Sequence, residues 1–280
     1  MSLHKLSLVF LYCLTLIVAG YLTFVGWDYY SRPLHERARH ELHEEWKPSG
    51  FVGRASGIAG STLMVMLLLY SLRKRWRFMK QGWGDIRYWL NYHIWMGVTG
   101  PVLIIYHTSF KFGGIVAVSF WSMVAVALSG VIGRYIYVQI PRSLSGEELS
   151  SAELLELDAG MRTRLSAEVG SNSKALALLS EFDEHPANQA SGFMKWLLRD
   201  LTAQARYGNL RSRLVREAGV DRGTAKALAA LAKKRALLDR RIAFLGTARQ
   251  LLHHWHVFHK PFAIIMLVIM VVHIVVDWVF

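Results

Sequence analysis

The chain alternates between long apolar segments and polar stretches. Five apolar segments stand out, at residues 6–27, 54–72, 88–110, 114–140 and 257–280. Each is close to the length of about 20 residues that a helix needs to cross a bilayer. A spanning segment must satisfy its own backbone hydrogen bonds, and we see no segment with the pattern of a series of strands. We therefore predict an all-α integral membrane bundle of five transmembrane helices.

One large polar region, residues 142–254, separates the fourth and fifth apolar segments. Ser-Gly-Glu-Glu at 145–148 predicts a helix start, and residues 171–192 are typical of turns around a short helix. From Asp221 onward, Ala, Leu, Lys and Arg predict one long basic helix that runs into the fifth span. The expected domains are spans one to four at 1–141, a helical insertion at 142–254 and the fifth span at 255–280.

The first apolar segment has a second interpretation. It follows Lys5 and could be a secretory signal. Its apolar run is longer than the roughly 7–15 residues of a signal core, so we favour an uncleaved span.

The composition of the whole chain, with 53% hydrophobic residues, agrees with a membrane protein.

The positive charge is concentrated next to apolar segments and predicts the orientation. The net charge is +13, and the loop after the second segment is strongly basic, with Arg73, Lys74, Arg75, Arg77 and Lys80. That loop should be cytoplasmic, whereas the mixed-charge loop 28–53 should lie outside. The amino terminus and residues 142–254 are then cytoplasmic and the carboxyl terminus periplasmic, in a bacterial inner membrane. No zinc-finger spacing is present, so we expect anionic lipid and no nucleic acid as the partner of these charges.

Cysteine usage limits the cofactors. Cys13 is the single cysteine and lies inside an apolar run. One cysteine cannot hold an iron–sulfur cluster, and no C-x-x-C-H motif is present for covalent haem. Any redox cofactor must be held by histidine or noncovalently.

Two apolar segments carry histidines at the same spacing. His93 and His107 lie in the third segment, and His259 and His273 in the fifth. Fourteen residues come to about 40° short of four helical turns, so each pair faces one side of its helix, about 21 Å apart along the axis. Both segments run from inside to outside in the predicted topology, so two histidine pairs would form at matched depths.

This constellation predicts two b-type haems. A haem iron takes two axial ligands on opposite faces, and imidazole is a common one. We pair His93 with His259 on the inner haem and His107 with His273 on the outer haem. Intramembrane ionisable residues are usually functional, but histidines that only pack between helices remain an alternative. A different metal is another, although zinc or copper prefers a tighter cluster.

Small and basic residues near these histidines complete the predicted site. Gly97 and Gly100 lie on the stripe from His93 to His107 and could let a planar ring approach the helix. Arg54, Arg87 and Arg134 lie near span ends and are candidate partners of the haem propionates, with snorkelling to the interface as the alternative. The second segment has Gly53, Gly57 and Gly60 on one face, open to a helix or to a flat cofactor.

Other histidines are less informative. His253, His254 and His256 precede the fifth span and could serve a quinone pocket or proton uptake, or could simply lie at the interface. The outer-loop histidines His35 and His40, together with His43, are expected to be solvated.

With these four histidines in place, spans two to five resemble the di-haem membrane cytochrome b superfamily, in particular the ferric-reductase-like and NADPH-oxidase-like transmembrane domains. The resemblance implies haem ligation by His93, His107, His259 and His273, and it does not extend to residues 142–254. The chain departs from the oxidase pattern because it shows no sixth span and no flavin- or nicotinamide-binding domain.

The sequence thus predicts a di-haem cytochrome b subunit that carries electrons across the membrane, between a quinone pool or redox partner on one side and a partner subunit on the other. Two bis-histidine haems leave no open iron position, so we expect an electron-transfer subunit rather than a catalyst acting alone. Expected partners carry iron–sulfur clusters, flavin or c-type haem, with quinol as a further ligand. A self-contained membrane ferric or quinone reductase and a haem-free membrane anchor or transporter are the alternatives.

Overall fold

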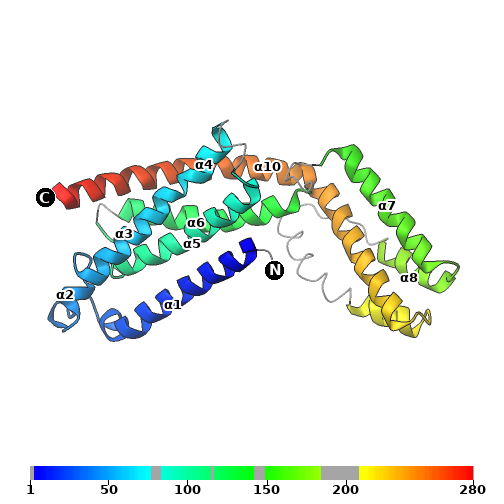
Figure 1. Ribbon diagram of the computed structural model, residues 1–280, viewed down its shortest axis with the longest axis horizontal. Coiled ribbons are helices and arrows are strands. Elements are labelled where there is room, and N and C mark those ends of the chain that lie inside the picture. Colours follow the sequence, from blue (N-terminus) through cyan, green and yellow to red (C-terminus); the bar gives the residue numbers. More distant parts are fainter. Residues whose placement is uncertain (1–2, 77–82, 115–116, 142–148, 184–207, 280) are drawn as a thin grey trace. The chain divides into compact units, whose positions relative to one another are not determined.

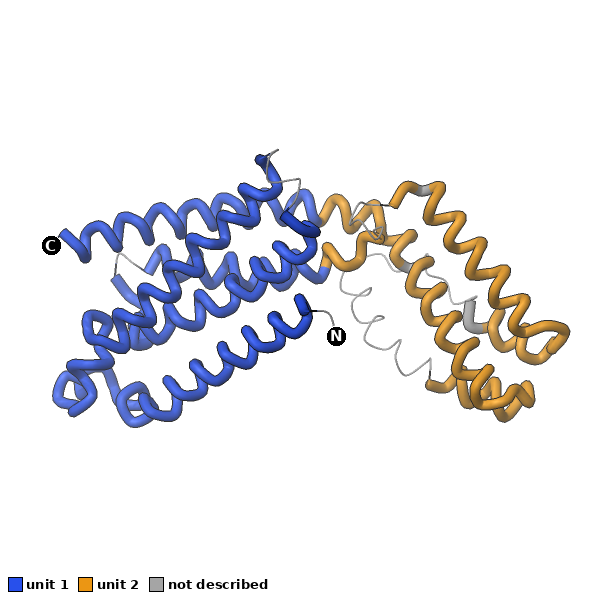
Figure 2. Tube along the Cα trace, in the orientation of Figure 1, with its two compact units in different colours: residues 1–135, 252–280 blue, residues 136–251 orange. Residues whose placement is uncertain are grey.

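A computed structural model describes residues 3–76, 83–114, 117–141, 149–183 and 208–279. Every regular element in these ranges is a helix, which confirms the all-α prediction for this part of the chain. The chain divides into two compact units, residues 1–135 with 252–280, and residues 136–251 (Figure 2). These divisions lie within a few residues of the boundaries at 141/142 and 254/255 that the sequence suggests.

The first unit is a set of long helices that lie lengthwise beside one another (Figure 1). Its elements are α1 (Leu3–Ser31), the 3-10 helix η1 (Arg37–Arg39), α2 (His43–Trp46), α3 (Phe51–Met66), α4 (Leu68–Arg75), α5 (Ile86–His107), α6 (Ala117–Gln139) as far as residue 135, and the C-terminal part of α10 (Arg222–Val279). All four predicted haem ligands belong to this unit, on α5 and α10.

Four segments of the described chain are long and apolar enough to cross a membrane, namely Leu3–Ser31, His43–Arg75, Ala117–Gln139 and Arg241–Val279. They correspond to four of the five predicted spans and place the chain with integral membrane proteins by length and composition. The remaining predicted span is α5, a helix of 22 residues. Its first half carries Tyr88, Asn91, Tyr92 and His93, which lower its hydropathy. The crossing of the bilayer by α5 stays a prediction.

Helices α1 and α5 run in the same direction. The ring of His4 lies 4.1 Å from that of Tyr88 near the beginning of both helices. The Thr23 hydroxyl lies 2.6 Å from the Tyr106 hydroxyl near their ends. Hydrogen bonds between polar side chains are a common means of holding helices together where apolar packing gives little driving force, as in lipid.

Helix α3 runs antiparallel to α5. Gly57 near the start of α3 lies against the ring of His107 at the end of α5. Leu67, which follows α3, lies against His93 near the start of α5. Close approach at the glycine positions lets these two helices pack tightly.

Helix α6 runs antiparallel to α10, because Ser119 contacts Met266 whereas Ser129, later in α6, contacts His259, earlier in α10. The five long helices α1, α3, α5, α6 and α10 therefore alternate in direction along the chain, as successive membrane crossings do. Helices α5 and α10 are parallel, because His93 lies near His259 and His107 lies near His273. A core of pliable methionines and one phenylalanine joins α3, α6 and α10, and its buried residues are Met64, Phe120, Met123, Met266 and Met270.

At the end of α5, a buried arginine holds a strained turn. Ser109 and Phe110 adopt positive φ angles of 48° and 60°, which non-glycine residues rarely do. The Arg37 guanidinium donates to the carbonyl oxygens of Ser109 at 2.5 Å, Tyr30 at 2.6 Å and Arg32 at 2.8 Å. It thereby ties the end of α1 to the turn that follows His107.

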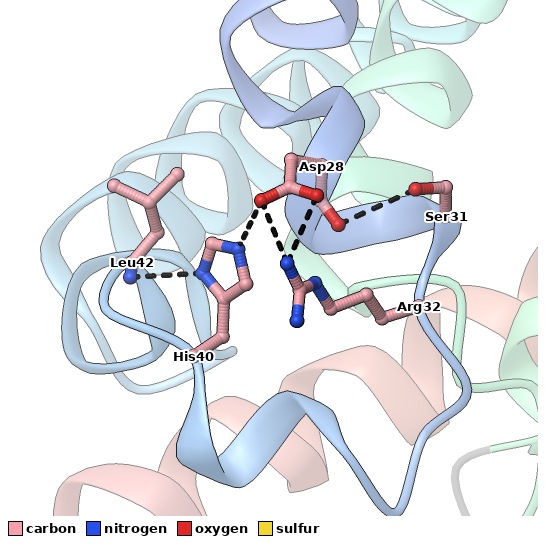
Figure 3. A network of polar contacts seen from close by, with 5 residues as sticks. All are labelled: Asp28, Ser31, Arg32, His40 and Leu42. Carbon is pink, nitrogen blue, oxygen red and sulfur yellow. Dashed lines mark hydrogen bonds and ion pairs between the residues drawn. The ribbon is translucent and has the colours of Figure 1, made fainter.

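The expectation that the outer-loop histidines are solvated is wrong for His40, whose side chain is 8% exposed. Figure 3 shows its Nε2 directed at Asp28, 2.7 Å from the carboxylate. Its Nδ1 accepts a hydrogen bond from the Leu42 backbone N–H at 3.0 Å. The neutral His40 ring therefore carries its hydrogen on Nε2 and donates it to Asp28. Solvation was predicted because local sequence does not show that the loop folds back onto α1.

The second unit contains α7 (Ser151–Val169), α8 (Ser173–Asp183), a helix at 208–216 and the N-terminal part of α10. The described start of α7 is a capping box between Ser150 and Glu153, and the predicted start at 145–148 lies outside the described residues. Helix α10 begins at Arg222, after Asp221 accepts two backbone hydrogen bonds, which confirms the single long helix predicted from that residue onward. Helix α8 is the short helix predicted within 171–192, of which residues 184–192 lie outside the described chain.

Alanines and leucines form the core of this unit, and a buried ion pair joins two of its helices. The Arg235 side chain on α10, 8% exposed, lies 3.1 Å from the Asp158 carboxylate on α7. Asp158 also pairs with Arg162 at 2.7 Å. The core consists of Leu165, Val169, Ala175, Leu178, Leu179, Leu210, Leu214, Ala225, Leu228, Ala229 and Ala232.

The arginine at the end of α1 gives a first testable prediction. Arg37→Met should lower the free energy of unfolding by about 3 kcal/mol, because three carbonyl groups lose a charged donor. The change is measured by denaturant titration of the detergent-solubilised chain. Arg39→Met, at an exposed position of the same 3-10 helix, is the matched control and should change stability little. Equal effects of the two substitutions would contradict this role of Arg37.

Candidate functional site

The outer histidine pair comes together between α5 and α10. His107 is the last residue of α5 and His273 lies on α10. Their ring centroids are 6.5 Å apart, and the ring planes meet at 54°. Both side chains are half-buried. The structure therefore brings together the two residues that the sequence assigns to the outer haem, and their ligation of haem stays a prediction.

The inner histidine pair joins the same two helices. His93 on α5 and His259 on α10 lie within electrostatic range of each other, and both are half-buried. An aromatic ring flanks each of them. Tyr70 lies 5.0 Å from His93, and Trp255 lies 4.5 Å from His259, measured between ring centroids.

Two of the four predicted ligands have an Nδ1 that faces a backbone carbonyl. His107 Nδ1 lies 2.9 Å from the Gly53 carbonyl oxygen, and His93 Nδ1 lies 3.3 Å from that of Leu67. A carbonyl oxygen can only accept, so Nδ1 carries the hydrogen in both rings. Nε2 of each neutral imidazole then keeps a free lone pair, which is the form that binds a metal.

His259 reaches the same tautomer through a serine. Its Nδ1 lies 2.7 Å from the Ser129 hydroxyl oxygen on α6. The single hydroxyl hydrogen of Ser129 is donated to the Val126 carbonyl oxygen at 2.9 Å. Ser129 can therefore only accept from His259, and the Nε2 lone pair of His259 is free.

The backbone of the second predicted span supplies both carbonyl acceptors. Gly53 lies in the first turn of α3, and Leu67 lies at the break between α3 and α4. Gly57 allows the ring of His107 to come close, because a Cβ at that position would lie 2.6 Å from His107 Nδ1. Sequence reasoning noted the glycine face of this segment but could not assign it to a particular histidine.

The two glycines predicted to face a cofactor lie against α3. A Cβ on Gly100 would lie 2.9 Å from the Met64 sulfur and 3.4 Å from the Gly60 carbonyl oxygen. A Cβ on Gly97 would meet Leu67 at 3.9 Å. The observed use of Gly100 is thus close helix packing, and a role of either glycine beside a haem stays a prediction.

The three arginines occupy different environments. Arg54 on α3 is exposed. Arg87 donates to the Asp85 carboxylate at 2.8 Å, and these hydrogen bonds hold the pKa of the Asp85 carboxyl below its ordinary value. Arg134 on α6 is half-buried and within electrostatic range of the Tyr12 hydroxyl. Arg87 therefore already has an anionic partner, and the propionate role of all three stays a prediction.

Of the histidines that precede the fifth span, His256 is the most embedded. Its Nδ1 donates to the Leu252 carbonyl oxygen at 2.7 Å, and its ring is half-buried. Lys74 and Lys260 lie within electrostatic range of it. The surroundings of His256 are therefore rich in cationic groups.

Sequence reasoning missed several residues of this site. Ser129, Tyr70 and Trp255 contact histidines, but nothing in their local sequence marks them. Asp277 had a signal, an acid within an apolar run one helical turn after His273, and it lies within electrostatic range of His107.

Among the described residues, no group of three or more His, Cys, Asp or Glu side chains is arranged to hold a metal ion. The four predicted ligands instead occur as two separate pairs. Comparison with protein-family models, with curated proteins and with solved structures found no match to this chain.

Proposed function

We propose that the chain carries electrons across a membrane through two noncovalent b-type haems, one held by His93 and His259 and the other by His107 and His273. The observation that carries the proposal is the shared state of the histidines. Three of the four have Nδ1 hydrogen-bonded to an acceptor, which leaves Nε2 to bind a metal.

The spacing of the outer pair supports a metal between the rings. An imidazole nitrogen binds a first-row metal at about 2 Å, so two imidazoles on opposite sides of one ion have ring centroids about 6 Å apart. The His107 and His273 centroids are 6.5 Å apart. A haem bound by either histidine pair would act as a one-electron carrier, because two histidines would fill the binding positions of its iron.

The protein's own part is to hold and orient the ligands. Helices α5 and α10 carry one ligand of each pair. The Gly53 carbonyl on α3 holds His107, the Leu67 carbonyl between α3 and α4 holds His93, and the Ser129 hydroxyl on α6 holds His259. Met266 and Met270 lie in the buried core between the two pairs and exclude water from it.

The alternating directions of the long helices support five membrane crossings, with α5 as the third. We place the amino terminus and residues 142–254 in the cytoplasm and the carboxyl terminus in the periplasm, because α4 ends in Arg73, Lys74 and Arg75. The partners we propose are redox subunits with iron–sulfur clusters, flavin or c-type haem, together with membrane lipid and quinol.

Substitution of the ligands tests this function. His107→Ala should remove the outer haem and largely spare the inner one, and His93→Ala should do the converse, because each haem would lose an axial bond. The measurement is the reduced-minus-oxidised spectrum of the purified variants, scaled to protein. His35→Ala, with an 80% exposed side chain, is the matched control and should keep both haems. Full haem content in all three variants would contradict the assignment.

Gly57 provides a test that leaves every ligand in place. Gly57→Ala puts a methyl group into the His107 ring and should lower the outer haem content, although alanine favours a helix by about 1 kcal/mol. Gly20→Ala, where the new methyl group meets no atom within 4 Å, should leave haem content unchanged. Haem content is measured by pyridine haemochrome, and unchanged content in the Gly57 variant would show that His107 needs no such close approach.

A further inference from the structure

A tryptophan and a serine both contact the ring of His259. Trp255 donates from Nε1 to the Ser129 carbonyl oxygen at 2.7 Å. Its ring lies 4.5 Å from the His259 ring at an angle of 33°. Gly133 makes room for it, since a Cβ there would lie 2.3 Å from the Trp255 ring. Trp255 is thus held between α6 and His259.

Ser129 contacts the same imidazole through its hydroxyl group. Its hydroxyl donates to Val126 and accepts from His259 Nδ1, at 2.9 and 2.7 Å. His107 and His93 use backbone carbonyls for the same purpose. The inner ligand on α10 is therefore the one whose described acceptor is a side chain, so its hydrogen bond can be removed by a single substitution.

We infer that Ser129 and Trp255 are positioning residues that fix the plane of His259 and strengthen it as an electron donor, and so lower the reduction potential of the inner haem. This inference rests on the proposed function. An acceptor at Nδ1–H increases the basicity of the ligating nitrogen. A stronger donor stabilises the ferric iron, which is more positive than the ferrous one, so the potential falls.

The structure also supplies a matched control for the serine. Ser119 lies on α6 and donates to the Met266 carbonyl oxygen of α10 at 3.0 Å. It joins the same two helices as Ser129 and is buried, but its hydrogen bond ends on a backbone carbonyl rather than on a histidine. Loss of its hydroxyl tests helix packing alone.

The test is an equilibrium redox titration of the purified, haem-loaded chain, followed by optical and electron paramagnetic resonance spectra. In Ser129→Ala the ratio of reduced to oxidised inner haem at a fixed ambient potential should rise roughly fivefold, the value of one hydrogen bond. The outer haem should keep its potential, and Ser119→Ala should leave both unchanged. Ser129→Thr keeps a hydroxyl and should restore the wild-type ratio. Trp255→Leu should change the electron paramagnetic resonance signal of the inner haem alone, because the variant lacks the ring that fixes the plane of the His259 imidazole.

The outcomes separate this inference from the proposed function. A wild-type chain without haem overturns the proposed function. A haem-loaded Ser129→Ala variant with an unchanged inner potential, or with equal shifts in both haems, overturns the inference and leaves the function standing. If Ser129→Ala loses the inner haem while Ser129→Thr and Ser119→Ala retain it, positioning of His259 is supported. Loss of the inner haem in Ser129→Thr as well contradicts it.

Discussion

A neutral imidazole carries one hydrogen, and the acceptor of that hydrogen decides which nitrogen remains free. In this protein the hydrogens of His107 and His93 are directed to carbonyls of the second predicted span, and that of His259 to a hydroxyl on α6. Several structural features allow these three hydrogen bonds to form. Gly57 admits the His107 ring, the break at Leu67 lies beside His93, and Val126 takes the hydroxyl hydrogen of Ser129.

The directions of the helices set which histidines meet. Helices α5 and α10 are parallel, so the early histidine of one helix meets the early histidine of the other, and the same holds for the late pair. Equal spacing of 14 residues on both helices puts the two pairs in register. Helices α3 and α6 run antiparallel to α5 and α10, and hydrogen-bond acceptors on α6, on α3 and just after α3 lie beside the histidine rings. Buried methionines fill the space between the two ends.

The part of the site that could be predicted from the sequence is the set of histidines, because their spacing along the chain reveals them. Histidines are rare within apolar segments, and here the interval between them is repeated, which marks His93, His107, His259 and His273. The long helix from Arg222 onward was also predictable, from composition and Asp221. Ser129 and Trp255 were not, since their role depends on contacts more than 120 residues away. The prediction that the loop histidines are solvated was wrong for the same reason. Arg37 and His40 are buried by parts of the chain that fold back over them. Gly100 shows a further limit, because a glycine stripe indicates close approach but not whether a helix or a cofactor approaches.

The central claim is that the two histidine pairs hold haem, and the haem content of the purified chain tests it most directly. The chain is purified in mild detergent, shown to be folded and monodisperse, and assayed by pyridine haemochrome against its protein concentration. The account predicts two b-type haems per chain, extractable by acidic acetone and reducible by dithionite. A folded protein that shows no haem absorbance after expression with ample haem supply would contradict it.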